Sequence, residues 1–338
     1  MEQHIPLVGI TLGDPVGIGP EVVAKAIASG TLREVARLVV IGSVPVLNKA
    51  LALTGSSLKG RAVANPGDSV SDVEIAVYEP KGLPSGLRNL PYGEVSLEAG
   101  QAAVIWVKAA AELAMAGRIS AIATAPINKH AANLAGYADV GHQEIYQAMT
   151  GADQVVTMLV TPGLRVVHLT THRSLRIACD YVTKDNILEK LRLTHEFFVS
   201  QRFAPARIAV AALNPHGGEA GIIGMEEIEE IAPAIEAARA AGMDVTGPIP
   251  ADTVFNQSIE GRFDVVLAMY HDQGHVAIKV HDWASSVTMN LGLPFLRTSV
   301  DHGTAFDIAG QGIADSTGMV QAVRLAALVS GNGSIADF

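Results

Sequence analysis

Short apolar runs alternate along this chain with longer helix-like stretches, and glycine and proline often mark the boundaries. The runs predict buried strands at residues 5–12, 37–42, 73–78, 119–124, 154–160, 165–169, 207–213 and 263–269. Helices are expected over residues 96–117, 184–201 and 225–241, and a TPG turn at 161–163 predicts a hairpin. Strands that alternate with helices favour a largely parallel sheet with helices on its faces, so the predicted fold class is α/β.

The loop after the first strand, residues 13–19 (GDPVGIG), leads into a predicted helix that begins near Pro20 and Glu21. Proline suits the first helical turn because it has no N–H to satisfy, and an acid there meets the positive end of the helix dipole. A glycine-rich loop in this position can hold a phosphate. The loop matches neither GxGxxG nor GxxxxGK[ST], however, so a tight turn without a ligand is an equal alternative.

The composition indicates a packed protein of more than one domain. Hydrophobic residues make up 49% of the 338 positions and charged residues 17%, and the mean hydropathy is +0.30. A chain of this length is long for one domain, so two are expected. The net charge of −10 argues against generic nucleic-acid binding, because phosphate backbones require clustered Lys and Arg. An acidic protein that handles an anionic substrate must concentrate its few cations in the pocket.

Cys179 is the only cysteine, which excludes a disulfide within the chain and a cysteine-based zinc site. The N-terminal sequence MEQHIPLV lacks the basic and apolar regions of a signal peptide. The most apolar long segment, residues 99–117, is interrupted by Gln101, Lys108 and Glu112, so we expect a buried helix there and not a membrane span. The prediction is a cytoplasmic protein that binds neither membranes nor nucleic acid.

Three histidines, His172, His216 and His271, fall at or just after the C-terminal ends of predicted strands. Such ends can converge at one edge of a sheet, where ligands gather. Neutral imidazoles suit zinc and other divalent first-row metals, and three protein ligands leave positions open for a substrate. Asp252 and Asp272 are candidates for orienting a ligand or transferring a proton. The spacing matches no local metal motif, so polar strand-end residues bonded to the backbone are the alternative.

Residues 270–310 are the strongest candidate for an active-site region. They begin with a His-Asp pair and continue with Lys279 and Arg297, two cations able to hold an anionic substrate, before a glycine-punctuated loop at 301–304 (DHGT). Elsewhere, His142 lies at a predicted helix start, where backbone N–H groups can hold an anion. A capping or surface histidine is the alternative for that position.

Eight segments resemble the 4-hydroxythreonine-4-phosphate dehydrogenase (PdxA) family. They are ITLGDPVGIGPE (10–21), TAPINK (124–129), GHQE (141–144), TTHRSLR (170–176), LNPHGGE (213–219), GPIPADT (247–253), YHDQGH (270–275) and LGLPFLRTSVDHGTAFDIAG (291–310). They occur in order over nearly the whole chain, and the last is specific.

The resemblance implies two α/β/α domains arranged as in isocitrate and isopropylmalate dehydrogenases. A cofactor-side domain is expected from residues 1–135 and 300–338, and a metal, substrate and dimerisation domain from residues 136–299. Members of the family work as homodimers, with the active site in an interdomain cleft that both subunits line.

The resemblance also implies roles for individual residues. His172, His216 and His271 would bind a divalent metal such as zinc, magnesium, cobalt or manganese. The implied substrate contacts, with a phosphate held by cations, are His142, Gln143, Lys279, Thr288 and Arg297. The final segment resembles the part of isopropylmalate dehydrogenase that packs on the adenosine of NAD, so the residues implied near NAD or NADP are His302, Gly303, Thr304 and Asp307.

The implied reaction is oxidation of a secondary alcohol, followed by loss of CO₂ from the resulting β-keto acid. A divalent metal lowers the pKa of the alcohol and stabilises the enolate left by decarboxylation, and a nicotinamide takes the hydride. Asp252, Asp272 and Lys279 are alternative proton acceptors.

Two positions depart from the family pattern. The residue after the GH histidine is usually Thr and is Gln143 here, and the VNxTLGLP segment usually has Asn where this chain has Thr288. Asn290 lies two residues later, on the same face if the segment is a strand. Both departures concern the substrate. They favour 4-phospho-D-threonate or 4-phospho-D-erythronate over 4-hydroxythreonine 4-phosphate, the vitamin B6 precursor of pyridoxine biosynthesis.

Three alternatives stay open. One is an NAD-dependent decarboxylating dehydrogenase of an aromatic cis-dihydrodiol carboxylate. A second is an acyl transferase of the phosphate acetyltransferase type, which shares the fold but needs neither metal nor NAD; the three strand-end histidines and the DHGTAFDIAG loop speak against it. The third is a catalytically silent binding protein on the same scaffold.

Overall fold

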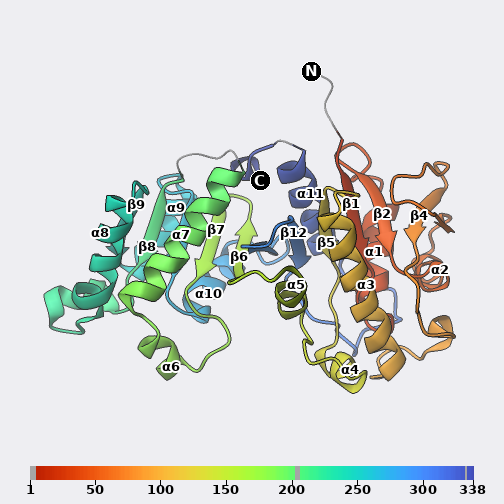
Figure 1. The fold of residues 1–338 in the computed structure, drawn as a ribbon, viewed down its shortest axis with the longest axis horizontal. Helices are drawn as coiled ribbons and strands as arrows, with labels where there is room; N and C mark the ends of the chain where they lie inside the picture. The colour runs from red at the N-terminus through yellow and green to blue at the C-terminus, as the bar shows by residue number, and fades with distance from the viewer. Residues whose placement is uncertain (1–4, 202–205, 332) are drawn as a thin grey trace. The chain divides into compact units, whose positions relative to one another are not determined.

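The chain folds into two compact α/β units, which confirms the predicted fold class (Figure 1). The computed structural model describes residues 5–201, 206–331 and 333–338. Unit 1 comprises Met1–Val155 and Leu293–Gly333, and unit 2 comprises Val156–Gly292 and Ser334–Phe338.

In unit 1, the strands of a β-sheet largely alternate along the sequence with α-helices. Its strands are β1 (Leu7–Thr11), β2 (Arg37–Ile41), β3 (Lys59–Ala62), β4 (Glu74–Tyr78), β5 (Ala121–Thr124) and β12 (Arg297–Val300). Its α-helices are α1 (Gly19–Ala28), α2 (Val44–Leu53), α3 (Leu97–Met115), α4 (Lys129–Leu134), α5 (His142–Thr150) and α11 (Thr317–Ser330), with a 3₁₀ turn at Leu87–Asn89. The strand pairs run parallel in the order β3-β4-β2-β1-β5-β12.

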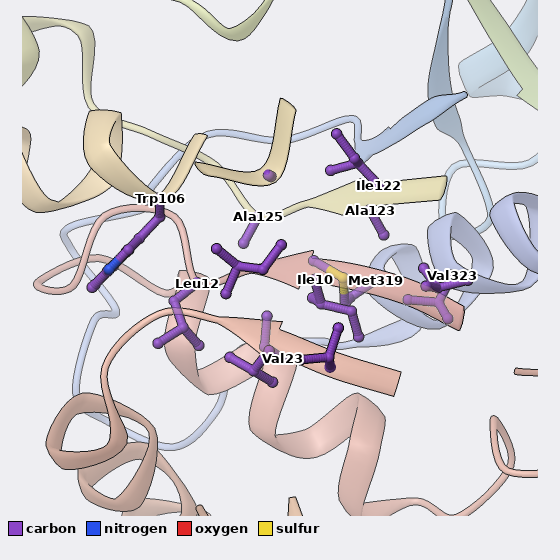
Figure 2. Packing of buried hydrophobic residues seen from close by; sticks show 14 of the residues in the cluster. Ile10, Leu12, Val23, Trp106, Ile122, Ala123, Ala125, Met319 and Val323 are labelled. Atoms are coloured by element: carbon purple, nitrogen blue, oxygen red, sulfur yellow. The ribbon is translucent and has the colours of Figure 1, made fainter. Parts of the chain in front are cut away.

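The core of unit 1 gathers around β1, where Val8 and Ile10 are fully buried. Figure 2 shows Ile10 and Leu12 among apolar side chains of other elements, labelled as Val23 (α1), Trp106 (α3), Ile122 and Ala123 (β5), Ala125, and Met319 and Val323 (α11). A central parallel strand covered on both faces reads as an apolar run without alternation, which is why it was predictable. Full burial of each large apolar side chain stabilises the fold by roughly 1.5–3 kcal/mol.

Unit 2 has a mixed sheet. Its strands are β6 (Val156–Thr161), β7 (Leu164–His168), β8 (Ile208–Ala211), β9 (Val245–Ile249), β10 (Val265–Ala268) and β11 (Val287–Leu291). Its helices are α6 (Leu175–Asp180), α7 (Lys184–Ser200), a π-helical turn at Glu227–Ile231, α8 (Ala232–Ala240), α9 (Ala251–Ile259) and α10 (His271–His281), with 3₁₀ turns at Pro215–Gly221 and Ile335–Asp337.

The strands of unit 2 lie in the order β11-β6-β7-β10-β8-β9. The pairs β11–β6 and β6–β7 are antiparallel, and β7–β10, β10–β8 and β8–β9 are parallel. The predicted hairpin at residues 161–163 is confirmed, because the turn at Pro162 and Gly163 joins β6 to β7. The expectation of a largely parallel sheet therefore describes unit 1 better than unit 2, where a two-residue turn can join only antiparallel strands.

The division of the chain differs from the expected boundaries at 135/136 and 299/300. The structure divides it after Val155 and after Gly292, because α5 packs on α3 and β12 pairs with β5. The C-terminal residues 334–338 belong to unit 2, where the buried guanidinium of Arg165 donates hydrogen bonds to the carbonyls of Ile335 (3.2 Å) and Asp264 (3.0 Å). The functional labels given to the two domains stay predictions.

Among the described residues, no helix has the length and apolar character needed to cross a membrane.

Gly100 permits the close packing of α3 against α4. A Cβ at Gly100 would overlap the carbonyl group of Ala131. Replacing Gly with Ala inside a helix normally stabilises a protein by about 0.5–1 kcal/mol. We expect Gly100→Ala instead to destabilise unit 1 by about 1–3 kcal/mol, because the added methyl group must displace backbone. Urea unfolding followed by circular dichroism measures this change.

Gly67→Ala is the matched control, since the nearest atom to its added methyl group would be Nη2 of Arg37 at 3.9 Å. Gly100→Ala as stable as the wild type would contradict the close contact of α3 with α4.

Candidate functional site

The C-terminal ends of three neighbouring strands in unit 2 lead to the predicted metal ligands. The strands β7, β10 and β8 lie side by side and run parallel. His172 follows β7, His216 follows β8, and His271 is the first residue of α10 after β10. The three strand ends therefore share one edge of the sheet, as the chain order predicted.

Four histidines gather at this edge, namely His168, His172, His271 and His275, which we call the histidine cluster. The ring centroids of His172 and His271 lie 6.2 Å apart. His271 stacks on His275 with centroids 3.6 Å apart, and Nδ1 of His275 lies 3.2 Å from Nε2 of the buried His168. Burial, reinforced by His275 and His271, lowers the pKa of His168 to about 3. This ring is therefore neutral near pH 7.

The first residues of α10 fix the position of the histidine cluster. The buried amide of Gln273 accepts a hydrogen bond from the backbone N–H of Met269 (2.7 Å) and donates one to the carbonyl of Ala212 (2.8 Å). It thereby joins the ends of β10 and β8. A Cβ at Gly274 would overlap the ring of His168. Glycine at this position lets α10 lie close to β7.

His216 lies on a turn with an unusual backbone. The φ angles of residues 216–220 lie between 46° and 79°, the left-handed region that residues other than glycine rarely adopt. The carboxylate of the buried Glu227 holds the start of the turn, because it accepts hydrogen bonds from the backbone N–H (2.7 Å) and side-chain amide (2.8 Å) of Asn214. The ring of His216 is 68% exposed, and its Nδ1 lies 2.9 Å from Oε1 of Glu219.

These residues provide two side chains suited to a metal ion. The imidazoles of His172 and His271 lie near each other, and Oδ1 of Asp272 lies 2.7 Å from Nδ1 of His271, where it can orient the ring. Across the described residues, no group of three His, Cys, Asp or Glu side chains is placed to hold a metal ion, so His216 does not complete the pair. The three-histidine site stays a prediction.

The other predicted residues of unit 2 lie on three elements. Asp252 and Asp272 are exposed in the first turns of α9 and α10. Nζ of Lys279 lies 4.7 Å from the ring centroid of Trp283. Thr288 is half-buried on β11, two residues before the buried Asn290 and on the same face of the strand. Asp272 is the proton-acceptor candidate that contacts His271; the roles of Asp252 and Lys279 stay predictions.

Unit 1 contains a buried cation at the start of β12. Arg297 is 6% exposed, and its Nε and Nη2 donate to the hydroxyl of Thr124 at 3.1 and 2.7 Å. Burial lowers the pKa of Arg297 to about 10, against the raising effects of Tyr146 and Glu144. The guanidinium therefore stays charged near neutral pH. A cation in such an environment attracts an anionic ligand strongly, because water screens the interaction little.

The helix α5 brings two more polar side chains into the electrostatic environment of Arg297. His142 and Tyr146 lie one turn apart, with ring centroids 6.3 Å apart. Within the described part of the chain, Nε2 of His142 and the hydroxyl of Tyr146 are buried and have no hydrogen-bond partner. Burial, followed by the charges of Arg297 and Lys129, lowers the pKa of His142 well below its usual value. The imidazole is therefore neutral.

Sequence reasoning missed Tyr146, His168 and His275. Tyr146 follows His142 by four residues and His275 follows His271 by four, so helical spacing was an available signal for both. By contrast, the predicted substrate residue Gln143 donates a hydrogen bond from Nε2 to the carbonyl of Val155 (2.8 Å).

The predicted cofactor loop contacts the glycine-rich loop after β1. The backbone N–H of Ile18 donates to the carbonyl of Thr304 (3.0 Å), and a Cβ at Gly17 would lie 2.9 Å from the same oxygen. All four cofactor candidates lie in one partly exposed loop. They are His302, Gly303, Thr304 and Asp307. Their role towards NAD or NADP stays a prediction.

Known proteins resemble this chain over almost its whole length. A family model described as "Pyridoxal phosphate biosynthetic protein PdxA" matches residues 34–326. A D-threonate 4-phosphate dehydrogenase from Cupriavidus necator is 44% identical over 326 residues, which cover 96% of this chain and 97% of the relative. The crystal structure of a 4-hydroxythreonine-4-phosphate dehydrogenase from Klebsiella pneumoniae matches with a TM-score of 0.89 and 42% identity, covering 96% of this chain and 99% of that one.

A more distant solved structure is a terephthalate 1,2-cis-dihydrodiol dehydrogenase from Burkholderia xenovorans, with a TM-score of 0.66, 29% identity, and coverage of 96% and 98%. The relatives named here are dehydrogenases, and the fold is that of an α/β protein of this class. The chain belongs to the PdxA family, which confirms the resemblance found in its sequence motifs.

Asp14, in the loop after β1, is a buried acid whose ionisation opposes folding. Its Oδ1 accepts a hydrogen bond from the backbone N–H of Val16 (2.9 Å). Burial raises its pKa from 3.8 to about 6, although backbone hydrogen bonds from Val16 and Gly17 lower it. Because the pKa of Asp14 is higher in the folded state than in the unfolded state, its protonated carboxyl group contributes its full stabilisation below about pH 4. This stabilisation is lost as the pH rises through about 6.

We therefore expect Asp14→Asn, which keeps the acceptor oxygen, to gain stability relative to the wild type between about pH 4 and pH 7.5. The pKa difference of about 2 corresponds to a gain of at most about 3 kcal/mol. Urea unfolding at several pH values measures it, with the exposed Asp139→Asn as control. A stability difference that does not change with pH would contradict this account.

Proposed function

We propose that this protein is a divalent-metal-dependent NAD(P) dehydrogenase that oxidises and decarboxylates D-threonate 4-phosphate or D-erythronate 4-phosphate. The observation that carries the proposal is the identity of more than 40% over nearly the full length to a relative named D-threonate 4-phosphate dehydrogenase. The buried Arg297 supports an anionic substrate, and the neighbouring imidazoles of His172 and His271 support a divalent metal. 4-Hydroxythreonine 4-phosphate, after which similar solved structures are named, is the second candidate substrate.

The proposed substrate suits this reaction because its C3 hydroxyl lies β to the carboxylate. Transfer of hydride from C3 to NAD(P)⁺, with loss of the hydroxyl proton to a base, gives a β-keto acid. Cleavage of the C1–C2 bond releases CO₂ and leaves an enediol, which takes up a proton at C2. The products are dihydroxyacetone phosphate, CO₂ and NAD(P)H.

The chain's own residues have separate tasks in this proposal. His172 and His271 would hold the metal with His216 as the third ligand, and the bound ion would lower the pKa of a substrate hydroxyl and offset charge in the decarboxylation. Asp272 orients the ring of His271 through their 2.7 Å contact. Asp252, Asp272 and Lys279 are the candidates for the base.

Further residues bind the substrate and the nicotinamide cofactor. Arg297 and His142 would bind the anionic group of the substrate, assisted by Lys279, Gln143 and Thr288. Residues 302–307 would contact NAD or NADP. We also propose that the enzyme works in the cytoplasm as a homodimer whose subunits both line the active site.

An exposed apolar row supports the proposed dimer. Val276 and Val280 on α10 are 58% and 82% exposed, and Trp283, just after the helix, is 73% exposed. Val276 and Val280 lie one helical turn apart on α10, and exposed apolar surface of this kind is typical of an interface. A second copy of the chain is the occupant we propose.

Val280→Lys is therefore expected to convert the dimer to a monomer, because the interface would have to bury an unpaired charge. Light scattering after gel filtration gives the mass. Val73→Lys, at a position 64% exposed in unit 1, is the matched control and should remain dimeric. A wild-type protein that is monomeric would contradict the dimer.

The reaction class is tested by the appearance of NADH or NADPH with metal-loaded enzyme and four substrates. These are D-threonate 4-phosphate, D-erythronate 4-phosphate, 4-phosphohydroxy-L-threonine and an unphosphorylated cis-dihydrodiol carboxylate. We expect turnover of one of the first two, with one CO₂ released per nicotinamide reduced, and loss of turnover in EDTA. His216→Ala should reduce turnover and retained metal by at least about 100-fold, because it removes a direct ligand.

His130→Ala, an exposed histidine on α4, is the control and should keep full activity and metal content. Turnover of 4-phosphohydroxy-L-threonine alone would move the assignment to the second substrate. Turnover of the dihydrodiol alone, or no turnover with any substrate and either cofactor, would refute the proposed function.

A further inference from the structure

Tyr146 is a buried tyrosine whose hydroxyl has no hydrogen-bond partner among the residues that the structure describes. Its side chain is 0% exposed, and its ring packs edge-on against Phe295 with centroids 5.3 Å apart. Among the described residues nothing bonds to its hydroxyl. Phenylalanine would fill the same space without burying a polar atom. Packing therefore explains the ring of Tyr146 but not its hydroxyl.

The fold brings Tyr146 towards the buried cation Arg297. The ring of Tyr146 packs on Phe295, two residues before Arg297 in the chain, and Arg297 and Tyr146 each act on the pKa of the other. His142, one turn earlier on α5, contributes a second buried polar atom, Nε2, that has no hydrogen-bond partner in the described part of the chain. The Tyr146 hydroxyl and Nε2 of His142 thus both lie in the electrostatic environment of the buried Arg297.

A buried hydroxyl without a partner costs free energy comparable to a lost hydrogen bond. A neutral phenol beside a cation can donate to a bound anion while the cation neutralises the charge of that anion. Burial raises the pKa of Tyr146, so the phenol keeps its proton at the working pH of the enzyme. The neutral imidazole of His142 has one ring N–H and can act in the same way. A phosphate has enough acceptor oxygens for all three groups.

We propose that the Tyr146 hydroxyl donates a hydrogen bond to the substrate phosphate bound by Arg297, and that Tyr146 thereby selects for phosphorylated substrates. This inference rests on the proposed function, in which the substrate is a phosphorylated acid. It assigns Tyr146 a binding role and no part in the hydride or proton transfers. A buried water bonded to the phenol is the competing explanation.

Tyr146→Phe removes the hydroxyl alone. In the full-length metal-loaded enzyme, we expect the dissociation constant for inorganic phosphate, measured by calorimetry, to rise about 10- to 100-fold, the usual effect of a hydrogen bond to a charged group. The KM for the phosphorylated substrate should rise similarly, with kcat nearly unchanged. Without ligand, the melting temperature should stay the same or increase, because an unsatisfied buried hydroxyl is gone. Tyr137→Phe, a half-buried tyrosine outside this environment, is the control and should change none of these values.

The outcomes separate this inference from the proposed function. Unchanged phosphate binding by Tyr146→Phe would overturn the inference in favour of a bound water. A lower melting temperature without ligand, with phosphate binding retained, would show a structural hydrogen bond and would also overturn it. If the wild type binds phosphate through Tyr146 but turns over no substrate in the panel, the proposed function fails and the inference stands. A wild type that does not bind phosphate overturns the inference, whatever it turns over.

Discussion

A charged guanidinium buried at the start of β12 is the constraint around which unit 1 is organised. Removing a cation from water is costly unless polar groups surround it. The parallel pairing of β12 with β5 places the hydroxyl of Thr124 beside Arg297, where it accepts two hydrogen bonds. Burial lowers the pKa of Arg297 to about 10, which leaves the guanidinium charged near neutral pH. Water screens a charge in this position little, and this is why we propose Arg297 as a group that binds the anionic substrate.

In unit 2, the proposed metal ligands at the strand ends are imidazoles and not a permanently charged group. The amide of Gln273 joins the ends of β10 and β8 through hydrogen bonds with the backbone of Met269 and Ala212, and Gly274 leaves space for the ring of His168. Burial keeps the imidazole of His168 neutral near pH 7. His271 stacks on His275, which in turn contacts His168, so the buried ring helps to position the imidazole proposed as a metal ligand.

The sequence predicted most elements whose apolar pattern is continuous, and it failed where the pattern is mixed. β1 and β10 are buried on both faces, so their residues form unbroken apolar runs. β3, with the sequence KGRA, is largely exposed and has no such run. α10, with the sequence HDQGHVAIKVH, was not predicted as a helix. It contains a glycine where the helix lies close to β7, and some of its apolar side chains are exposed to solvent. Tertiary contacts decided the conformation of both segments.

The candidate site was likewise predictable from the sequence only in part. Chain order predicted that the strands before His172, His216 and His271 end at one edge, because the rule depends only on topology. The orientation of His216 depends on successive left-handed residues that no propensity predicts. Tyr146 resembles a core aromatic in sequence, and only the environment of its hydroxyl distinguishes it. The family motifs support the reaction class that we propose. In our proposal the choice of substrate depends in addition on the donor Tyr146, which differs from a core phenylalanine by a single atom.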